Sequence, residues 1–138
     1  MSADILYIAT RARSFLERVW PIWHAAMGTK PAILSSGTCG RSSLFLQRVL
    51  KDDHTIASTW VTGNFMNAGN PERHSWLKVG DQIIDITADQ FGLDPIIIIP
   101  ANDGRYCAGE DMATPEFKAK RERNVTALWP DWCRIRAR

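Results

Sequence analysis

The sequence predicts one domain of helices and strands, with two helical segments first, then several strands and a last helix. Three observations predict this order. Apolar residues recur at helical spacing from Ala3 to about Met27, a second amphipathic segment follows Ser35, and β-branched residues dominate from Thr55. The 138 residues suit a single core, so we expect one domain over residues 1–138.

The first segment, residues 1–28, has the pattern of an amphipathic helix or a pair of helices. Pro21 has no backbone N–H to donate, so we expect a kink or break near Trp20. Gly28 is placed to end the helix. Residues 29–37 then form a linker.

A second helix is expected after the hydroxyl-bearing residues Ser35, Ser36 and Thr38, which offer N-terminal caps. Apolar residues as far as Leu50 supply its buried face. Cys39 falls in the first turn of this helix.

The strand region begins with residues 56–62, and the glycines and asparagines of residues 63–71 indicate a loop. A β-hairpin is predicted from residues 74–79 and 82–87, joined by a Gly-Asp turn. The apolar run of residues 95–100, bounded by two prolines, suits a further strand.

A last helix is predicted from Pro115 to about Leu128, with Thr114 as its cap. Residues 105–138 carry eight Lys or Arg against five Asp or Glu, a net charge of +3. This asymmetry has two interpretations: a patch for nucleic acid or an acidic partner, or a solvated helix face with a fraying end. We favour the second, so no nucleic-acid partner is predicted.

The residues that suggest chemistry are Cys39, His74 and Asp85. A helix N-terminus lowers the pKa of a thiol, which favours the nucleophilic thiolate. A histidine can take the thiol proton, and a carboxylate on the next strand can hold the ring. In the predicted hairpin His74 and Asp85 are two positions from being opposite, a diagonal that polar side chains bridge. Asp89 competes with Asp85 for the third role, and we favour Asp85.

The order Cys, His, Asp, with Gly-Thr-Cys-Gly at a helix start, His-Ser-Trp-Leu-Lys-Val on a strand and Ile-Asp-Ile-Thr on the next, resembles the transglutaminase-like group of papain-fold cysteine enzymes. The motifs cover about residues 35–92. The resemblance implies an α+β fold with the nucleophile helix packed on an antiparallel sheet, a catalytic core over residues 35–100, and a C-terminal helix and basic tail over residues 114–138.

The resemblance also implies roles for the three residues: Cys39 as nucleophile, His74 as general base and acid, and Asp85 as the carboxylate that orients the ring. The group's usual oxyanion donor, a glutamine shortly before the cysteine, has no counterpart here. The backbone N–H of Cys39 would then donate to the oxyanion, with Trp60 or Asn64 as candidates for the second donor.

The predicted function is therefore a cysteine hydrolase or acyltransferase that acts on a peptide or protein amide through a thioester, without a cofactor. One alternative is a non-catalytic binding module that uses the basic C-terminal helix. A weaker alternative is a metal site formed by the same three residues.

Other residues receive structural interpretations. Cys107 and Cys133 are expected to be packing residues, and His24 and His54 are expected to have no catalytic role, while Trp76 is a candidate wall of the substrate cleft. No apolar run approaches the ~20 residues of a spanning helix, so no membrane association is predicted. The N-terminus lacks a secretory pattern, which favours a cytoplasmic protein or an effector exported by a non-classical route.

Overall fold

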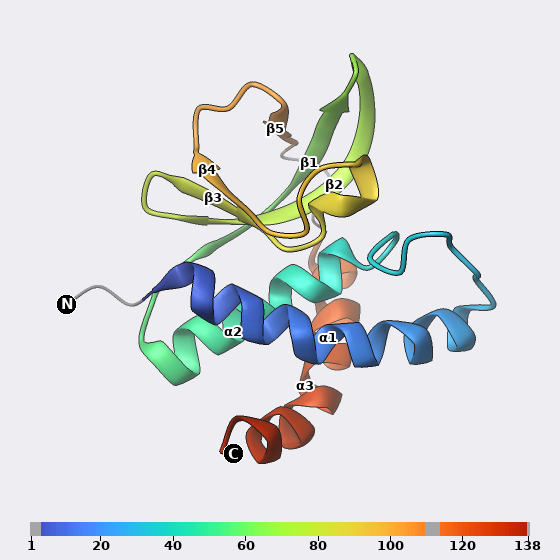
Figure 1. The fold of residues 1–138 in the computed structure, drawn as a ribbon, viewed down its shortest axis with the longest axis vertical. Helices are drawn as coiled ribbons and strands as arrows, with labels where there is room; N and C mark the ends of the chain where they lie inside the picture. Colours follow the sequence, from blue (N-terminus) through green and yellow to red (C-terminus); the bar gives the residue numbers. More distant parts are fainter. Residues whose placement is uncertain (1–3, 110–113, 138) are drawn as a thin grey trace.

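The computed structural model describes residues 4–109 and 114–137, and in these it has an α+β architecture (Figure 1). A layer of helices packs against one five-stranded antiparallel sheet. The α-helices are α1 (Ile5–Met27), α2 (Cys39–His54) and α3 (Pro115–Arg136). The strands are β1 (Thr59–Asn67), β2 (Asn70–Val79), β3 (Gln82–Asp85), β4 (Ile97–Pro100) and β5 (Tyr106–Ala108), with a short 3-10 helix η1 (Ala88–Phe91) after β3.

Helix α1 is one helix that continues through Pro21, which confirms the first of the two interpretations of this segment and shows that the helix does not break near Trp20. The proline removes one backbone hydrogen bond, but Trp20 and Trp23 on either side of it are both buried. Burial of these two large side chains favours continuation of the helix. The helix ends before Gly28, as predicted, because Gly28 adopts a left-handed conformation with a φ of 71°.

Helix α2 begins at Cys39, but the predicted hydroxyl cap is absent. The N-cap residue Thr38 makes no side-chain capping bond. Its hydroxyl instead donates to the carbonyl of Ser35 at 2.7 Å and accepts from the hydroxyl of Ser42 at 3.1 Å. Thr38 therefore ties the preceding turn to the helix.

The predicted loop at residues 63–71 is wrong, because this segment contains the end of β1, a tight turn and the start of β2. Strand β1 continues to Asn67, and β2 starts at Asn70 directly opposite it. Ala68 and Gly69 form the turn with φ angles of 50° and 84°. Two successive positive φ angles are the geometry that two-residue hairpins require, so the asparagines and glycines mark a tight turn and its flanks.

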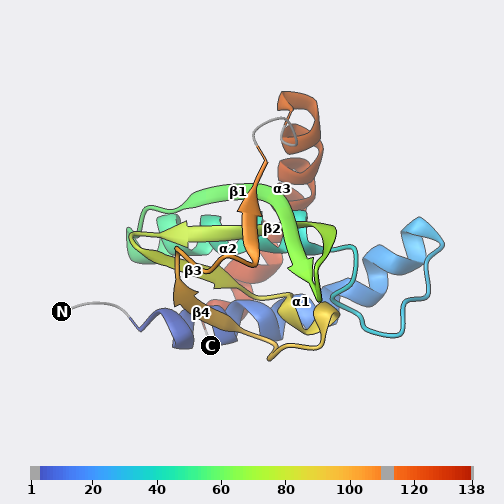
Figure 2. The same ribbon diagram turned by 90° about the horizontal axis from the view of Figure 1, so that it is seen from above.

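The second hairpin is confirmed, since β2 and β3 pair with Val79 opposite Gln82 around the predicted turn. Strand β4 is also confirmed and pairs with β3. Strand β5 was not predicted. The sheet order is β4-β3-β2-β1-β5, and Figure 2 shows the strands from the side opposite the helices.

The two faces of the sheet bury different clusters, because successive residues of a strand point to opposite faces. Leu77 and Ile84 pack with α1, α2 and α3 in the main core. Trp76 and Ile83 belong to a second, smaller cluster with Phe65 and Tyr106.

Helix α3 runs eight residues beyond the predicted end at Leu128 and passes through Pro130. Its C-terminal part is held to α2 by Asp53, which accepts hydrogen bonds from the Trp132 indole at 2.9 Å and from Arg136. The expected fraying end is therefore wrong as far as Arg136. No helix in residues 4–109 and 114–137 is long and apolar enough to cross a membrane.

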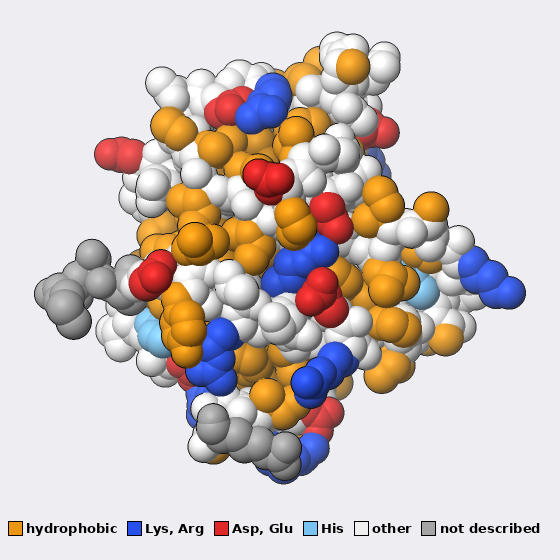
Figure 3. Space-filling model, viewed as in Figure 1, with side chains coloured by type: hydrophobic (Ala, Val, Ile, Leu, Met, Phe, Trp, Pro, Cys, Tyr) orange, Lys and Arg blue, Asp and Glu red, His pale blue; other side chains and the backbone are white. Residues whose placement is uncertain are grey.

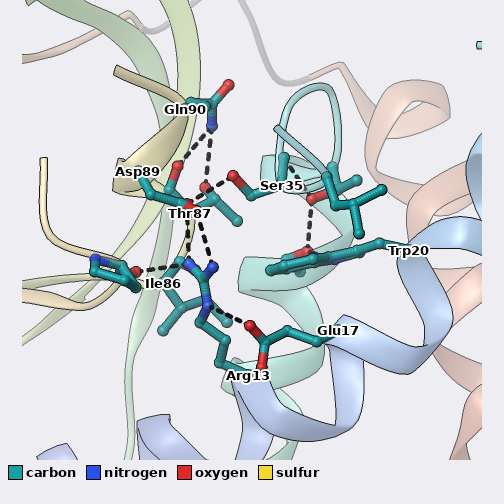
Figure 4. Close-up of polar contacts among 12 residues, drawn as sticks. Arg13, Glu17, Trp20, Ser35, Ile86, Thr87, Asp89 and Gln90 are labelled. Atoms are coloured by element: carbon teal, nitrogen blue, oxygen red, sulfur yellow. Dashed lines mark hydrogen bonds and ion pairs between the residues drawn. The ribbon is translucent and has the colours of Figure 1, made fainter. Parts of the chain in front are cut away.

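A buried arginine joins α1 to the segment that follows β3 (Figure 4). Arg13 donates twice to the carboxylate of Asp89, at 2.9 Å each, and also donates to the carbonyls of Ile86 and Pro95. Asp89 accepts a further hydrogen bond from the Ser35 hydroxyl at 2.7 Å. Burial opposes the charge on Asp89, but the bonds from Arg13 and Ser35 hold the pKa of this carboxyl below its ordinary value.

Replacement of Arg13 by Met should destabilise the fold by about 3 kcal/mol, because it leaves buried acceptors without a donor. Chemical denaturation at pH 7 would measure this loss. Because the pKa of Asp89 is lowered, its ion pair with Arg13 stabilises the folded protein above the ordinary carboxyl pKa, and this stabilisation is lost as pH falls through the lowered pKa. The difference in the free energy of unfolding between wild type and R13M should therefore shrink in acid. An equal difference at pH 7 and pH 3 would contradict this account.

Gly63 is required where β5 pairs with β1. A Cβ atom at this position would collide with the backbone of Cys107, Ala108 and Gly109. Gly63→Ala should therefore cost about 2 kcal/mol through overpacking, measured by thermal or chemical denaturation. Gly104→Ala is the matched control, since a Cβ there meets no atom within 4 Å. Similar stabilities of the two variants would show that the close approach is unimportant.

Candidate active site

The thiol of Cys39 lies at the first residue of α2, half-buried beside the sheet. The first N–H groups of a helix have no acceptor within the helix and carry partial positive charge. The backbone N–H of Ser75 on β2 also donates to the sulfur. The sulfur is therefore positioned between a helix N-terminus and a strand.

The ring of His74 is buried on β2 and bonds to Asp85 at the end of β3. Its Nε2 lies 2.7 Å from Asp85 Oδ2. The carboxylate has two further supports: the Tyr106 hydroxyl donates to Oδ2 at 2.8 Å, and the backbone N–H of Thr87 donates to Oδ1 at 3.0 Å. Asp85 is thus held from three directions. The second ring nitrogen of His74, Nδ1, is available to the thiol and also lies 3.5 Å from the amide nitrogen of Gln90.

Aromatic rings surround this histidine. Phe91 meets it edge-on with 4.8 Å between ring centroids, and Trp76 lies at 5.9 Å. Phe65 and Tyr106 complete the enclosure. These rings exclude water, which strengthens the electrostatic interaction between His74 and Asp85.

The thiol and the imidazole each favour the charged form of the other. Burial by itself disfavours the thiolate, but the hydrogen bond and charge of His74 and the N–H of Ser75 lower the pKa of Cys39 below its ordinary value. Burial also opposes protonation of His74, yet Asp85 and Cys39 together raise its pKa to about 9. Each group therefore shifts the other toward its charged form, thiolate for Cys39 and imidazolium for His74.

The pair opens onto a cleft of about 560 Å³. Cys39 and His74 line it together with Thr62 and Ser75 from the sheet. The remaining lining comes from the three α-helices, from β2 and from the turn before α2: Trp23, Ala26, Met27, Gly37, Gly40, Arg41, Arg73, Phe117, Lys120, Arg121 and Asn124. This volume is in the range of small-molecule and peptide side-chain pockets.

Protein-family models, curated proteins and solved structures were compared with the chain, and none matched. The transglutaminase-like core and the catalytic roles therefore stay predictions. The α+β class is what the structure itself shows.

The structure distinguishes the two aspartates that were candidates for the carboxylate beside His74. Asp85 contacts His74, whereas Asp89 contacts Arg13 and Ser35. The strand pattern distinguished them because Asp85 lies within β3 and Asp89 in the following 3-10 helix.

Three other expectations about the site differ from the structure. Trp60 donates its indole N–H to Ser43 at 2.9 Å, and neither Trp60 nor Asn64 lines the cleft, so neither is placed to serve the oxyanion. Trp76 is buried beneath His74 and does not line the cleft.

The remaining cysteines and histidines lie away from the site. Cys107 is exposed, so its interpretation as a packing residue is wrong, and Cys133 is half-buried on α3. His24 is a buried structural histidine that bonds to Thr29 and to the carbonyl of Leu34. Within the described ranges, no three His, Cys, Asp or Glu side chains are grouped so that they could hold a metal ion.

The sequence did not reveal Tyr106, Gln90 or the cations of the cleft. Tyr106 comes from the unpredicted strand β5, and no local pattern links it to Asp85. Gln90 follows Cys39 in the chain, so it does not match the glutamine that usually precedes the cysteine in the transglutaminase-like group. Its amide nitrogen lies 3.5 Å from His74 Nδ1 and donates to the carbonyl of Thr87. Both residues reach the site only through tertiary packing.

Asp85→Asn should lower the pKa of His74 from about 9 by at least about one unit, since it removes the adjacent negative charge. NMR titration of the ¹⁵N-labelled imidazole would measure this. Protonated His74 stabilises the fold fully below its ordinary pKa of 6.5, and this contribution is lost as pH rises through 9. Asp89→Asn is the matched control and should leave the His74 pKa unchanged; a larger effect from D89N would refute the assignment of Asp85.

Proposed function

We propose that this chain is a cysteine-dependent hydrolase or acyltransferase that acts on amide bonds. The observation that carries the proposal is the position of Cys39 at the first residue of α2 beside His74, whose ring bonds to Asp85 at 2.7 Å. In this arrangement the thiol and the imidazole each favour the charged form of the other. A thiolate beside an imidazolium has both the nucleophile and the proton donor that acyl transfer from an amide needs.

In the first half of the reaction, the Cys39 sulfur attacks the amide carbonyl and forms an S–C bond. The oxyanion accepts hydrogen bonds from the helix N-terminus, including the Cys39 N–H. The C–N bond then breaks, and the proton on His74 passes to the leaving amine. A thioester on Cys39 and a neutral imidazole remain.

In the second half, His74 takes a proton from water or from an acceptor amine, which attacks the thioester. The C–S bond breaks, and the acid or new amide leaves. Cys39 returns as thiolate and His74 as imidazolium. Asp85 stabilises the imidazolium in both halves, and Tyr106 keeps this carboxylate oriented.

The alternative of a separate binding module receives less support from the placement of the basic helix. Lys120 and Arg121 of α3 line the same cleft as Cys39. The basic face of α3 is therefore in part a wall of the candidate active site. A function that used this helix would also involve the thiol.

Alkylation with iodoacetamide at pH 7 tests the proposal. Cys39 should react at least about tenfold faster than Cys107 and Cys133, because its pKa is lowered by His74 while a thiol with an ordinary pKa is mostly protonated. His74→Gln should remove most of this advantage. Peptide mass spectrometry of quenched samples gives the rate at each cysteine.

Turnover provides the second measurement. A library of peptide amides should show release of amine by the wild type and none by Cys39→Ser, with Cys107→Ser as the matched control that keeps full activity. Circular dichroism would establish that each variant is folded. Equal, slow labelling of all three thiols in the folded wild type would overturn the proposal.

A further inference from the structure

Four cationic side chains from three different elements lie in the cleft that contains the thiol. Arg41 lies on α2, Arg73 on β2, and Lys120 and Arg121 on α3, and all four line the cleft. No Asp or Glu among the described residues lines it. The surface elsewhere is mixed: the face in Figure 3 carries Lys and Arg side chains next to Asp and Glu.

These cations form no ion pair with a carboxylate in residues 4–109 and 114–137. Arg121 lies close enough to Arg41 to lower the pKa of that guanidinium, in addition to the larger effect of burial. Arg73 has the same effect on Arg121. The arginines therefore repel one another, and an anion between them would relieve the repulsion.

The thiolate of Cys39 balances only part of this charge. The imidazolium of His74 is already paired with Asp85. Four cations against one thiolate leave a net charge of +3 around the cleft. Stabilisation of the sulfur anion alone does not require so many positive groups.

Two of the arginines are positioned before any ligand binds. The Arg41 guanidinium stacks on Trp23, 4.3 Å from the ring centroid, and that of Arg121 stacks on Phe117 at 3.4 Å. Arg121 also lies over Gly40, where a Cβ would meet its side chain at 2.8 Å. Stacking limits the conformations of each side chain, so less entropy is lost when the guanidinium binds an anion.

We propose that Arg41, Arg121 and their neighbouring cations bind a carboxylate of the substrate, and that the substrate is an acidic peptide whose Asp or Glu side chain lies next to the amide attacked by Cys39. The inference rests on the proposed function, because an acyl donor must bring an electrophilic carbonyl to the sulfur. Guanidinium groups suit carboxylates through paired hydrogen bonds. A nucleic acid would also complement the positive charge of the cleft, but it supplies no peptide amide for Cys39 to attack.

Two alkylating reagents of similar size test the charge preference. The Cys39 sulfur displaces iodide from iodoacetate, which is anionic, or from iodoacetamide, which is neutral. The rate ratio of iodoacetate to iodoacetamide should be at least about tenfold higher at Cys39 than at Cys107, and 0.5 M NaCl should reduce this preference.

Arg41→Gln and Arg121→Gln should each lower the Cys39 ratio by about fivefold. Arg48→Gln is the matched control, because Arg48 lies on the same helix as Arg41 and stacks on Trp129 at 4.1 Å, but does not line the cleft. If the arginines acted only on the thiolate, both rates would fall together and the ratio would not change. That result, or equal ratios at Cys39 and Cys107, would overturn the inference.

A direct measurement of binding distinguishes an acidic peptide from a nucleic acid as the source of the anion. Calorimetry with triglutamate should show binding to the wild type that Arg121→Gln weakens, while triglutamine should not bind. Tighter binding of an oligothymidylate than of triglutamate would refute the acidic peptide. The proposed function fails separately, through slow iodoacetamide labelling of Cys39, whereas this inference fails through the ratio and the binding data.

Discussion

The arrangement of the site depends on one buried charge interaction, the hydrogen bond between His74 and Asp85. Both side chains are almost fully buried, so water does little to stabilise their charges. Burial of an ion pair costs free energy unless further hydrogen bonds satisfy the remaining polar atoms. Tyr106 and the N–H of Thr87 supply those bonds to the carboxylate. The bond to Asp85 consequently fixes the orientation of the ring and leaves Nδ1 to the thiol and the Gln90 amide.

Much of the scaffold serves to hold these groups in place. Gly63 allows β5 to pack closely on β1, and β5 carries Tyr106 to the carboxylate. On the helical side, Arg13 joins α1 to Asp89 and to the segment directly after β3. The position of Asp85 is thus determined from both the sheet and the helical layer. Helix α2 then brings the thiol to the open side of the ring.

The electrostatics of the cleft differ from those of the buried pair. Beneath the surface, positive and negative groups balance, because His74 faces Asp85. At the surface, the Cys39 thiol lies in a cleft that is also lined by four cations, and no Asp or Glu among the described residues lines it. Such a field attracts anions and raises their local concentration near the sulfur. The proposed reactivity and the proposed substrate preference therefore rest on two separate sets of residues.

Local sequence patterns determined a large part of this protein. The 3.6-residue spacing of apolar side chains predicted α1 and α2, and the Gly-Asp turn predicted the register that places His74 diagonal to Asp85. These features depend on neighbours in the chain. The patterns failed where tertiary packing outweighed local preference: α1 continues through Pro21 because the tryptophans on both sides are buried, and residues 63–71 pair as strands although their composition indicates a loop.

Only the tertiary structure decided which distant residues share the site. Tyr106 is 21 residues from Asp85 in the chain, and Arg121 is far from Arg41, yet packing of β5 and α3 brings each pair together. Contacts of this kind depend on how faces of separate elements bury their apolar surface. A single sequence records the chemistry of each side chain and its local periodicity, but not the partner that burial selects.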